Sequence, residues 1–243
     1  MPRDRWLSHD LSGIEVNSTF YRLPSESLLK SLSSLPRTTA IVLKLWRYIT
    51  HMKLLKDIHR EWKEFVTALG DLKSRVDVVL VQLPPRFGYS LSNMDRVIEL
   101  KRLADRAGLR IAVEVRNSSW LNDKVYSRFR SSNICLVGTV IKKAKDDVKW
   151  LGTMPAGTTL PPATGDFTYT RFHGSKGYRG LYGVEELNRV KNRIKEQGQV
   201  SNYVFFNNAF YDYRTGPTKC PVTKTKAAAV CDAVMFKSLV ARN

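Results

Sequence analysis

Seven apolar segments recur along the chain, and each begins 24 to 36 residues after the previous one. They cover residues 13–19, 40–45, 76–84, 110–116, 134–140, 167–174 and 202–208. Most are nearly continuous apolar runs, typical of strands buried on both faces of a parallel sheet. The spacing is that of repeated strand–helix units. The pattern therefore predicts an α/β fold, either an open doubly wound sheet or most of an eight-stranded barrel.

Amphipathic segments lie between the predicted strands. In residues 92–108 the apolar positions have helical spacing, with Ser92 as the expected N-cap and Gly108 as the stop. Residues 184–198 repeat this pattern, and a further helix is expected at about 227–240. Neither a GxGxxG motif nor a P-loop follows the early strands. An open nucleotide-binding sheet therefore has no support from motifs.

Polar residues gather at the carboxyl end of six of the seven segments. They are Glu15, Asn17, Lys44, Gln82, Glu114, Arg116, Arg171, His173, Asn207 and Asn208. A solvated outer face of a sheet is one explanation for the pair Glu15 and Asn17. In a parallel α/β fold, however, all these strand ends lie on one rim, where such folds place their sites. The period of two also puts Glu114 with Arg116, and Arg171 with His173, on shared faces. We therefore expect a ligand pocket at this rim.

Composition adds a strong positive charge. The 243-residue chain has 40 Lys and Arg against 22 Asp and Glu, which gives a net charge of +18. Its hydrophobic content of 43% fits a folded globular protein. An excess of positive charge favours anionic partners, above all nucleic acid.

Cysteine usage and hydropathy bear on the compartment. Cys135, Cys220 and Cys231 form no CxxC pair and are odd in number, so we expect neither a disulfide framework nor a zinc ribbon. No apolar run approaches the roughly 20 residues of a membrane-spanning helix. The amino-terminal residues also lack the apolar core of a signal peptide. These observations predict a cytoplasmic or otherwise intracellular protein that is not secreted and has no membrane partner.

Several stretches resemble the YecE-like family, also known as domain of unknown function 72. The matching stretches are EVNSTFYRLPS (15–25), RYITHMKLLKD (47–57), QLPPRF (82–87), VEVRNSSW (113–120), RFHG (171–174) and FFNN (205–208). The resemblance implies a TIM-type (β/α) barrel formed as a single domain over residues 1–243. Family members usually begin with a strand and a GTSGW-like turn, which this sequence lacks. We therefore expect seven barrel strands with the first one missing, and a chain that is unstable or prone to aggregation alone. Residues 209–243 are expected to form a divergent, basic segment that contains a helix.

The loops beyond the rim supply further candidate ligand-binding residues. They are Tyr21, Arg47, Tyr48, His51 and Trp120. Cations outnumber the two carboxylates at the rim, which suits a phosphate or carboxylate ligand because guanidinium groups bind such anions bidentately. Glu15, Glu114 and His173 are the candidate catalytic residues for an enzyme that acts on a phosphorylated or nucleic-acid substrate. A buried ion-pair network, for instance between Glu114 and Arg171, is the structural alternative.

Other functions stay open at this point. Glu15 and Glu114 are also suited to act as the acid and base of a glycosidase, with Tyr21, Tyr48 and Trp120 as sugar platforms. The same aromatic residues, with Phe20, are suited to stack bases. The four histidines have no HExxH or HxH spacing, so we expect no cofactor. One Mg²⁺ bound to Glu15 and Glu114 is the alternative. A degenerate barrel that binds nucleic acid without turnover is the non-enzymatic alternative.

Overall fold

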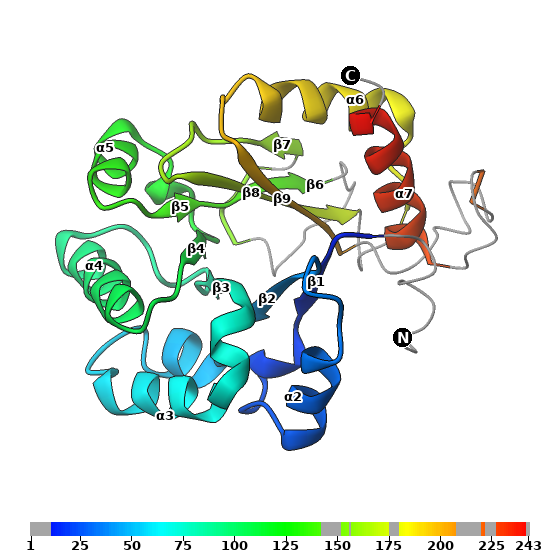
Figure 1. Ribbon diagram of the computed structural model, residues 1–243. Helices are drawn as coiled ribbons and strands as arrows, with labels where there is room; N and C mark the ends of the chain where they lie inside the picture. Colours follow the sequence, from blue (N-terminus) through cyan, green and yellow to red (C-terminus); the bar gives the residue numbers. More distant parts are fainter. Residues whose placement is uncertain are drawn as a thin grey trace. The chain divides into compact units, whose positions relative to one another are not determined.

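The structure is a computed structural model, described here for residues 11–141, 152–155, 157–174, 180–207, 220–221 and 227–241 (Figure 1). The chain divides into two compact units. The amino-terminal unit comprises the described residues from Ser12 to Leu136 together with 152–154, and the carboxy-terminal unit comprises the other described residues.

The amino-terminal unit contains a parallel sheet of five strands in the order β1-β2-β3-β4-β5. The strands are β1 (Gly13–Val16), β2 (Ala40–Lys44), β3 (Val76–Gln82), β4 (Ile111–Glu114) and β5 (Cys135–Leu136). The helices that alternate with them are α2 (Glu26–Ser33), α3 (His59–Leu69), α4 (Leu91–Arg106) and α5 (Asp123–Ser131). Figure 1 shows these four helices on one side of the sheet. The predicted repetition of strand–helix units is thus confirmed for this part of the chain.

Side-chain caps fix where the helices begin. The Oγ of Ser90 accepts a hydrogen bond from the backbone N–H of Asn93 at 3.1 Å, so Ser90 caps α4. The prediction that Ser92 is the cap was wrong. Ser90 has the extended backbone that an N-cap requires, whereas Ser92 already lies within the first turn of the helix. Gly108 follows the helix with a φ of +69°, the left-handed conformation that glycine adopts most readily.

The strand register divides the residues of the five-stranded sheet between two faces. One face carries the apolar side chains of Ile14, Val16, Ile41, Leu43, Val79, Val81, Ile111 and Val113. On the other face Glu15 pairs with Val42, Lys44 with Leu80, and Gln82 with Glu114. Since residues two apart on a strand point the same way, the polar strand ends share this second face.

The carboxy-terminal unit contains a second sheet, of four strands in the order β7-β6-β8-β9. The strands are β6 (Gly138–Ile141), β7 (Gly157–Thr159), β8 (Phe167–Gly174) and β9 (Ser201–Phe206). β6 and β9 run parallel to β8, and β7 pairs antiparallel with β6. The single strand predicted over residues 134–140 is in fact two, because β5 belongs to the first sheet and β6 to the second.

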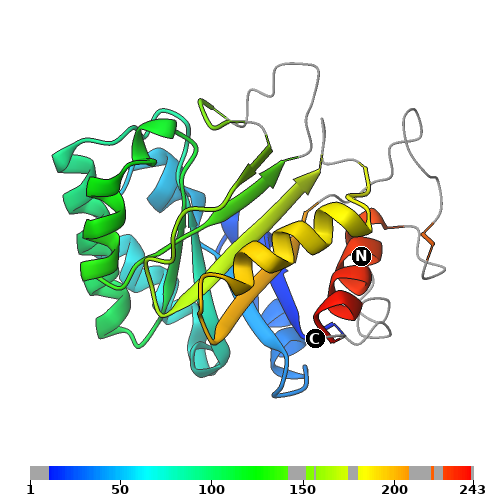
Figure 2. The ribbon, with the colours of Figure 1, turned by 90° about the horizontal axis from the view of Figure 1, so that it is seen from above.

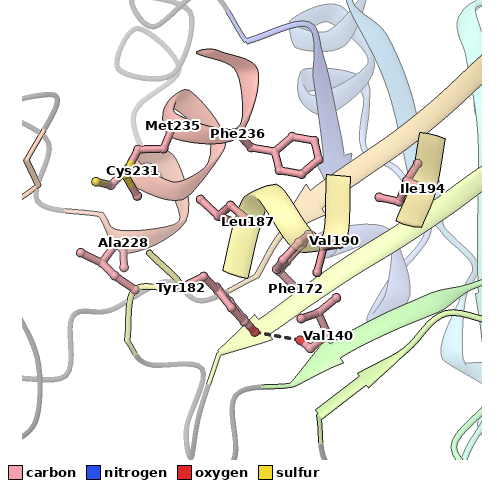
Figure 3. Packing of buried hydrophobic residues seen from close by; sticks show 11 residues of the cluster. Val140, Phe172, Tyr182, Leu187, Val190, Ile194, Ala228, Cys231, Met235 and Phe236 are labelled. Carbon is pink, nitrogen blue, oxygen red and sulfur yellow. Dashed lines mark hydrogen bonds between the residues drawn. The ribbon is translucent and has the colours of Figure 1, made fainter. Parts of the chain in front are cut away.

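Helices α6 (Val184–Lys195) and α7 (Ala228–Ala241) cover one face of the second sheet. Figure 2 shows α6 running over β8. Phe172 on β8 is fully buried in a cluster with residues of both helices (Figure 3). Its ring lies 4.5 Å from that of Phe206 and 4.8 Å from that of Tyr182. The Tyr182 hydroxyl donates to the carbonyl of Val140 at 2.8 Å, which ties the cluster to β6. The expected carboxy-terminal helix is confirmed.

One of the cysteine expectations was wrong. Cys220 and Cys231 form a disulfide across a Cα–Cα distance of 5.7 Å, and the latter residue is buried in the first turns of α7. The odd number of cysteines does not prevent this pairing, because the third, Cys135, is buried in β5 and takes no part in it.

The structure confirms the mixed α/β class with a parallel sheet. A closed TIM-type barrel and a single domain over the whole chain stay predictions. No helix in the described part of the chain is long and apolar enough to cross a membrane.

Candidate anion site at the carboxyl ends of the strands

The ends of β1 and β2 are tied together by one buried hydroxyl. The Oγ1 of Thr19 lies 2.7 Å from the carbonyl of Lys44 and 3.0 Å from the carbonyl of Val16. Beside this contact, the Asn17 amide donates to the Glu15 carboxylate at 3.1 Å. The Glu15 and Asn17 side chains therefore lie on the same side at the end of β1. The two side chains meet although β1 ends at Val16 and Asn17 has a helical backbone conformation.

Phe20 supports the cation at the end of β2. The Lys44 ammonium lies 4.1 Å from the centroid of the Phe20 ring, a cation–π contact. The same ring meets Tyr21 edge-on at 5.1 Å and His51 edge-on at 4.9 Å. The Phe20 ring thus packs among the side chains of Lys44, Tyr21 and His51. Tyr21 is the most exposed residue of this group, with 67% of its surface exposed.

His51 lies in a short π-helix, Tyr48–Met52 (η2), that follows β2. Its Nδ1 is 2.8 Å from the Thr50 hydroxyl, and the Arg86 guanidinium donates to its backbone carbonyl. Burial lowers the pKa of His51 to about 4, with further contributions from Lys44, Arg47, Arg86 and Arg116. The ring is therefore neutral at pH 7. Lys44, Arg47, Arg86 and Arg116 lie at or just after the carboxyl ends of β2, β3 and β4 in the chain, and the charge of each lowers this pKa.

At the end of β4, the guanidinium of Arg116 pairs with the carboxylate of Glu114. Both residues are buried, with exposed fractions of 2% and 0%. The prediction that they share a face is confirmed. Gly152 packs closely against the backbone after β4, where an added Cβ would collide with the carbonyl of Arg116. Gln82, the register partner of Glu114, brings an amide to the same face.

Trp120 does not present its ring to a ligand. It is fully buried, its Nε1 donates to the carbonyl of Phe87 at 2.8 Å, and its ring stacks on that of Phe87 at 5.8 Å. The 3₁₀-helix Ser118–Trp120 (η4) turns the indole back into the core beside Phe129. The prediction that Trp120 is a sugar or base platform was therefore wrong.

Two residues near the site were missed by the sequence reasoning. Arg86 contacts the π-helix and acts on His51, as described above. Trp46 stacks on Tyr48 with ring centroids 5.1 Å apart, and Tyr48 is 42% exposed. Arg86 lies within the family-like motif QLPPRF and Trp46 precedes an arginine, but the sequence alone does not show which residues these two side chains contact.

The remaining candidates belong to the carboxy-terminal unit. Arg171 and His173 on β8 are buried and alternate with Phe172, so they lie on the sheet face away from the cluster in Figure 3. Asn207 follows β9, and its backbone N–H donates to the carbonyl of Phe172 at 2.7 Å. Asn208 lies outside the described residues. That these residues join the amino-terminal site stays a prediction.

No group of three or more potential metal ligands occurs among the described residues. The placement of one Mg²⁺ on Glu15 and Glu114 stays a prediction.

A cavity of about 330 Å³ lies at the opposite, amino-terminal ends of β2 and β3. Arg75 in its lining already donates to the carbonyls of α2 and the following turn, at 2.9 to 3.3 Å. This cavity is therefore separate from the rim chemistry.

Comparison with known proteins gives the family but no activity. The family model described as protein of unknown function DUF72 matches residues 5–221. A DUF72 family protein from Thermotoga maritima has a similar structure, with a TM-score of 0.75 and 26% identity over 97% of this chain and 87% of that one. A DUF72 family protein from Enterococcus faecalis gives a TM-score of 0.72 at 17% identity, over 97% of this chain and 92% of that one. Among curated proteins none matches. The chain thus belongs to the DUF72 family, whose function is unknown.

Proposed function

We propose that the amino-terminal unit binds the phosphate of a phosphorylated ligand, a small molecule or a nucleic acid, at the carboxyl ends of β1 to β4. The supporting observation is the charge at this edge. Lys44, Arg47, Arg86 and Arg116 all act on the ring of His51, whereas the carboxylates of the site are Glu15 and Glu114. Four cations against two carboxylates leave a positive site. A multiply charged anion is the ligand that best balances it.

The cations differ in how they are held. Arg116 is buried and oriented by Glu114, so its guanidinium is preorganised. Lys44 is supported by the Phe20 ring. Arg47 and Arg86 are exposed, so their guanidinium groups can reach a ligand in solvent. The neutral ring of His51 and the amides of Asn17 and Gln82 add uncharged hydrogen-bonding groups. The sequence adds Arg171, His173 and Asn207 as further ligand-binding residues in a closed barrel.

In an enzyme, Glu114 or Glu15 would act as a base or a metal ligand, and the arginines would stabilise anionic charge. A degenerate barrel binds the same ligands without turnover. Glu114→Gln separates the two. In an enzyme this substitution should abolish catalysis while leaving charge-driven binding intact or slightly stronger.

The glycosidase alternative has less support. The Oε1 of Glu114 is engaged by Arg116 and is not directed at a sugar oxygen. Trp120, one of the expected sugar platforms, is buried in the core. A phosphate-type ligand fits the same groups without either difficulty.

Calorimetric titration with pyrophosphate, with and without Mg²⁺, tests the proposal. Lys44→Gln and Arg47→Gln should each weaken binding by about 1.5–3 kcal/mol, the value of a hydrogen bond to a charged group. Arg37→Gln is the matched control, because it removes one positive charge from an exposed residue at the opposite end of the sheet. An equal loss in all three variants would show that pyrophosphate follows net charge alone, and the proposed site would be wrong.

A further inference from the structure

Three partly exposed aromatic residues lie on the segments next to the cations, and we call them together the aromatic shelf: Tyr21, Trp46 and Tyr48. Tyr21 and Tyr48 are 67% and 42% exposed. The ring of Trp46 stacks on that of Tyr48, with centroids 5.1 Å apart and 29° between the planes. Large aromatic rings usually contribute their area to a core, so the exposure of Tyr21 and Tyr48 is a feature to explain.

The shelf adjoins the proposed phosphate site through ring contacts. Tyr21 touches Phe20, and Phe20 in turn carries the Lys44 ammonium and meets the ring of His51. Tyr48 is the first residue of the π-helix that contains His51. Arg47 lies between the two stacked rings in the sequence. Aromatic and cationic groups are therefore interleaved on the same short segments.

The segment that carries Trp46 and Tyr48 has an unusual backbone conformation, which side chains hold in place. It contains a π-helix, a rare conformation that is frequent at functional sites. Leu54, Leu55 and Asp57 follow with φ values of 51°, 57° and 47°, which residues other than glycine rarely adopt. The Arg86 guanidinium holds the carbonyl of His51, and the Lys53 ammonium holds that of Asp57 at 2.6 Å. Strain of this kind persists where the surroundings enforce it, and it clusters at ligand sites.

We infer that the aromatic shelf stacks the base of an unpaired nucleotide whose phosphate lies among the cations. This inference rests on the proposed function and narrows its ligand to one with a planar base. A phosphorylated sugar has no planar π face to stack on these rings, and a duplex keeps its bases stacked on one another. A free nucleotide or a single strand offers both a phosphate and an open base face. The chain's net charge of +18 suits such a polyanion.

Fluorescence anisotropy with two labelled probes tests the inference. One is a 5′-phosphorylated single-stranded oligothymidylate of eight nucleotides, and the other is an abasic oligomer with the same number of phosphates. The wild-type chain should bind the thymidylate about 5- to 150-fold more tightly, the range expected for stacking one base. Tyr48→Ala should lose most of this preference and keep its affinity for the abasic probe. Tyr48→Phe, the matched control, should keep both because it retains the ring.

The outcomes separate the shelf from the phosphate site. Equal binding of the two probes by the wild-type chain overturns the inference and leaves the proposed function standing. If neither probe binds, the shelf inference is overturned, and the pyrophosphate titration decides whether the proposed phosphate site fails with it. A loss of abasic binding in Tyr48→Ala would mark Tyr48 as a structural residue, and tighter binding of a duplex of the same length would also overturn the inference.

Discussion

Lowering the pH from 7 to 4 should destabilise the amino-terminal unit through His51. Burial and the nearby cations lower the pKa of this residue from 6.5 to about 4 in the folded state. Between these two values the unfolded chain holds a proton that the folded chain lacks. The free energy of unfolding therefore falls as the pH falls through this window.

The size of the effect follows from the two pKa values. The interval from 6.5 to about 4 corresponds to about 3.4 kcal/mol, at about 1.36 kcal/mol for each unit of pKa. The ring is not fully buried, and solvent screens part of the repulsion from the cations. We therefore expect about 1–2 kcal/mol from His51. The contribution should appear as the difference between the wild-type chain and His51→Gln, since other groups titrate in both.

The assay is urea unfolding at several values of pH, combined with NMR titration of the four histidine rings. The signal that is absent in His51→Gln identifies the residue. Phosphate ions bound among the cations should offset their charge, raise the pKa of His51 and reduce the pH dependence. If His51 titrates at 6.5 or above without phosphate, the cations do not gather around it. The electrostatic basis of the proposed site would then be refuted.

Three further substitutions test individual contacts by urea unfolding. Thr19→Val keeps the shape of the side chain but leaves two strand-end carbonyls without their hydroxyl, which should cost about 1–3 kcal/mol; an unchanged midpoint would contradict the contact. Trp120→Phe should cost a similar amount and leave pyrophosphate affinity unchanged, whereas a loss of affinity would restore Trp120 as a ligand residue. Cys231→Ser should destabilise the carboxy-terminal unit by about 2–3 kcal/mol, the value for opening a loop with a sequence separation of 11 residues. Identical unfolding with and without a reducing agent would argue against the disulfide.

The sequence predicts the strand–helix units well because their signals are local. Continuous apolar runs mark β2, β3 and β4, and helical spacing marks α4 and α6. The split between β5 and β6 at Val137 was missed, since both halves lie in one apolar run. β7 was missed as well, because three residues that pair antiparallel with β6 carry no periodic signal.

The sequence predicts which site residues lie at strand ends, but it does not predict which side chains they contact. The period of two correctly places Glu114 beside Arg116. Trp120 was misassigned because a 3₁₀-helix turns the indole inward, and composition cannot show that turn. The contact of Arg86 with the π-helix connects residues 35 positions apart, and such contacts depend on tertiary packing.

Anomalous diffraction from crystals soaked in tungstate, a phosphate analogue, tests the central claim most directly. The account predicts a tungstate peak within hydrogen-bonding distance, about 3 Å, of at least two of the four cations Lys44, Arg47, Arg86 and Arg116. The peak should be lost from crystals of Lys44→Gln grown and soaked in the same way. Tungstate bound elsewhere on the chain, with this edge of the sheet empty at the same concentration, would contradict the proposed phosphate site.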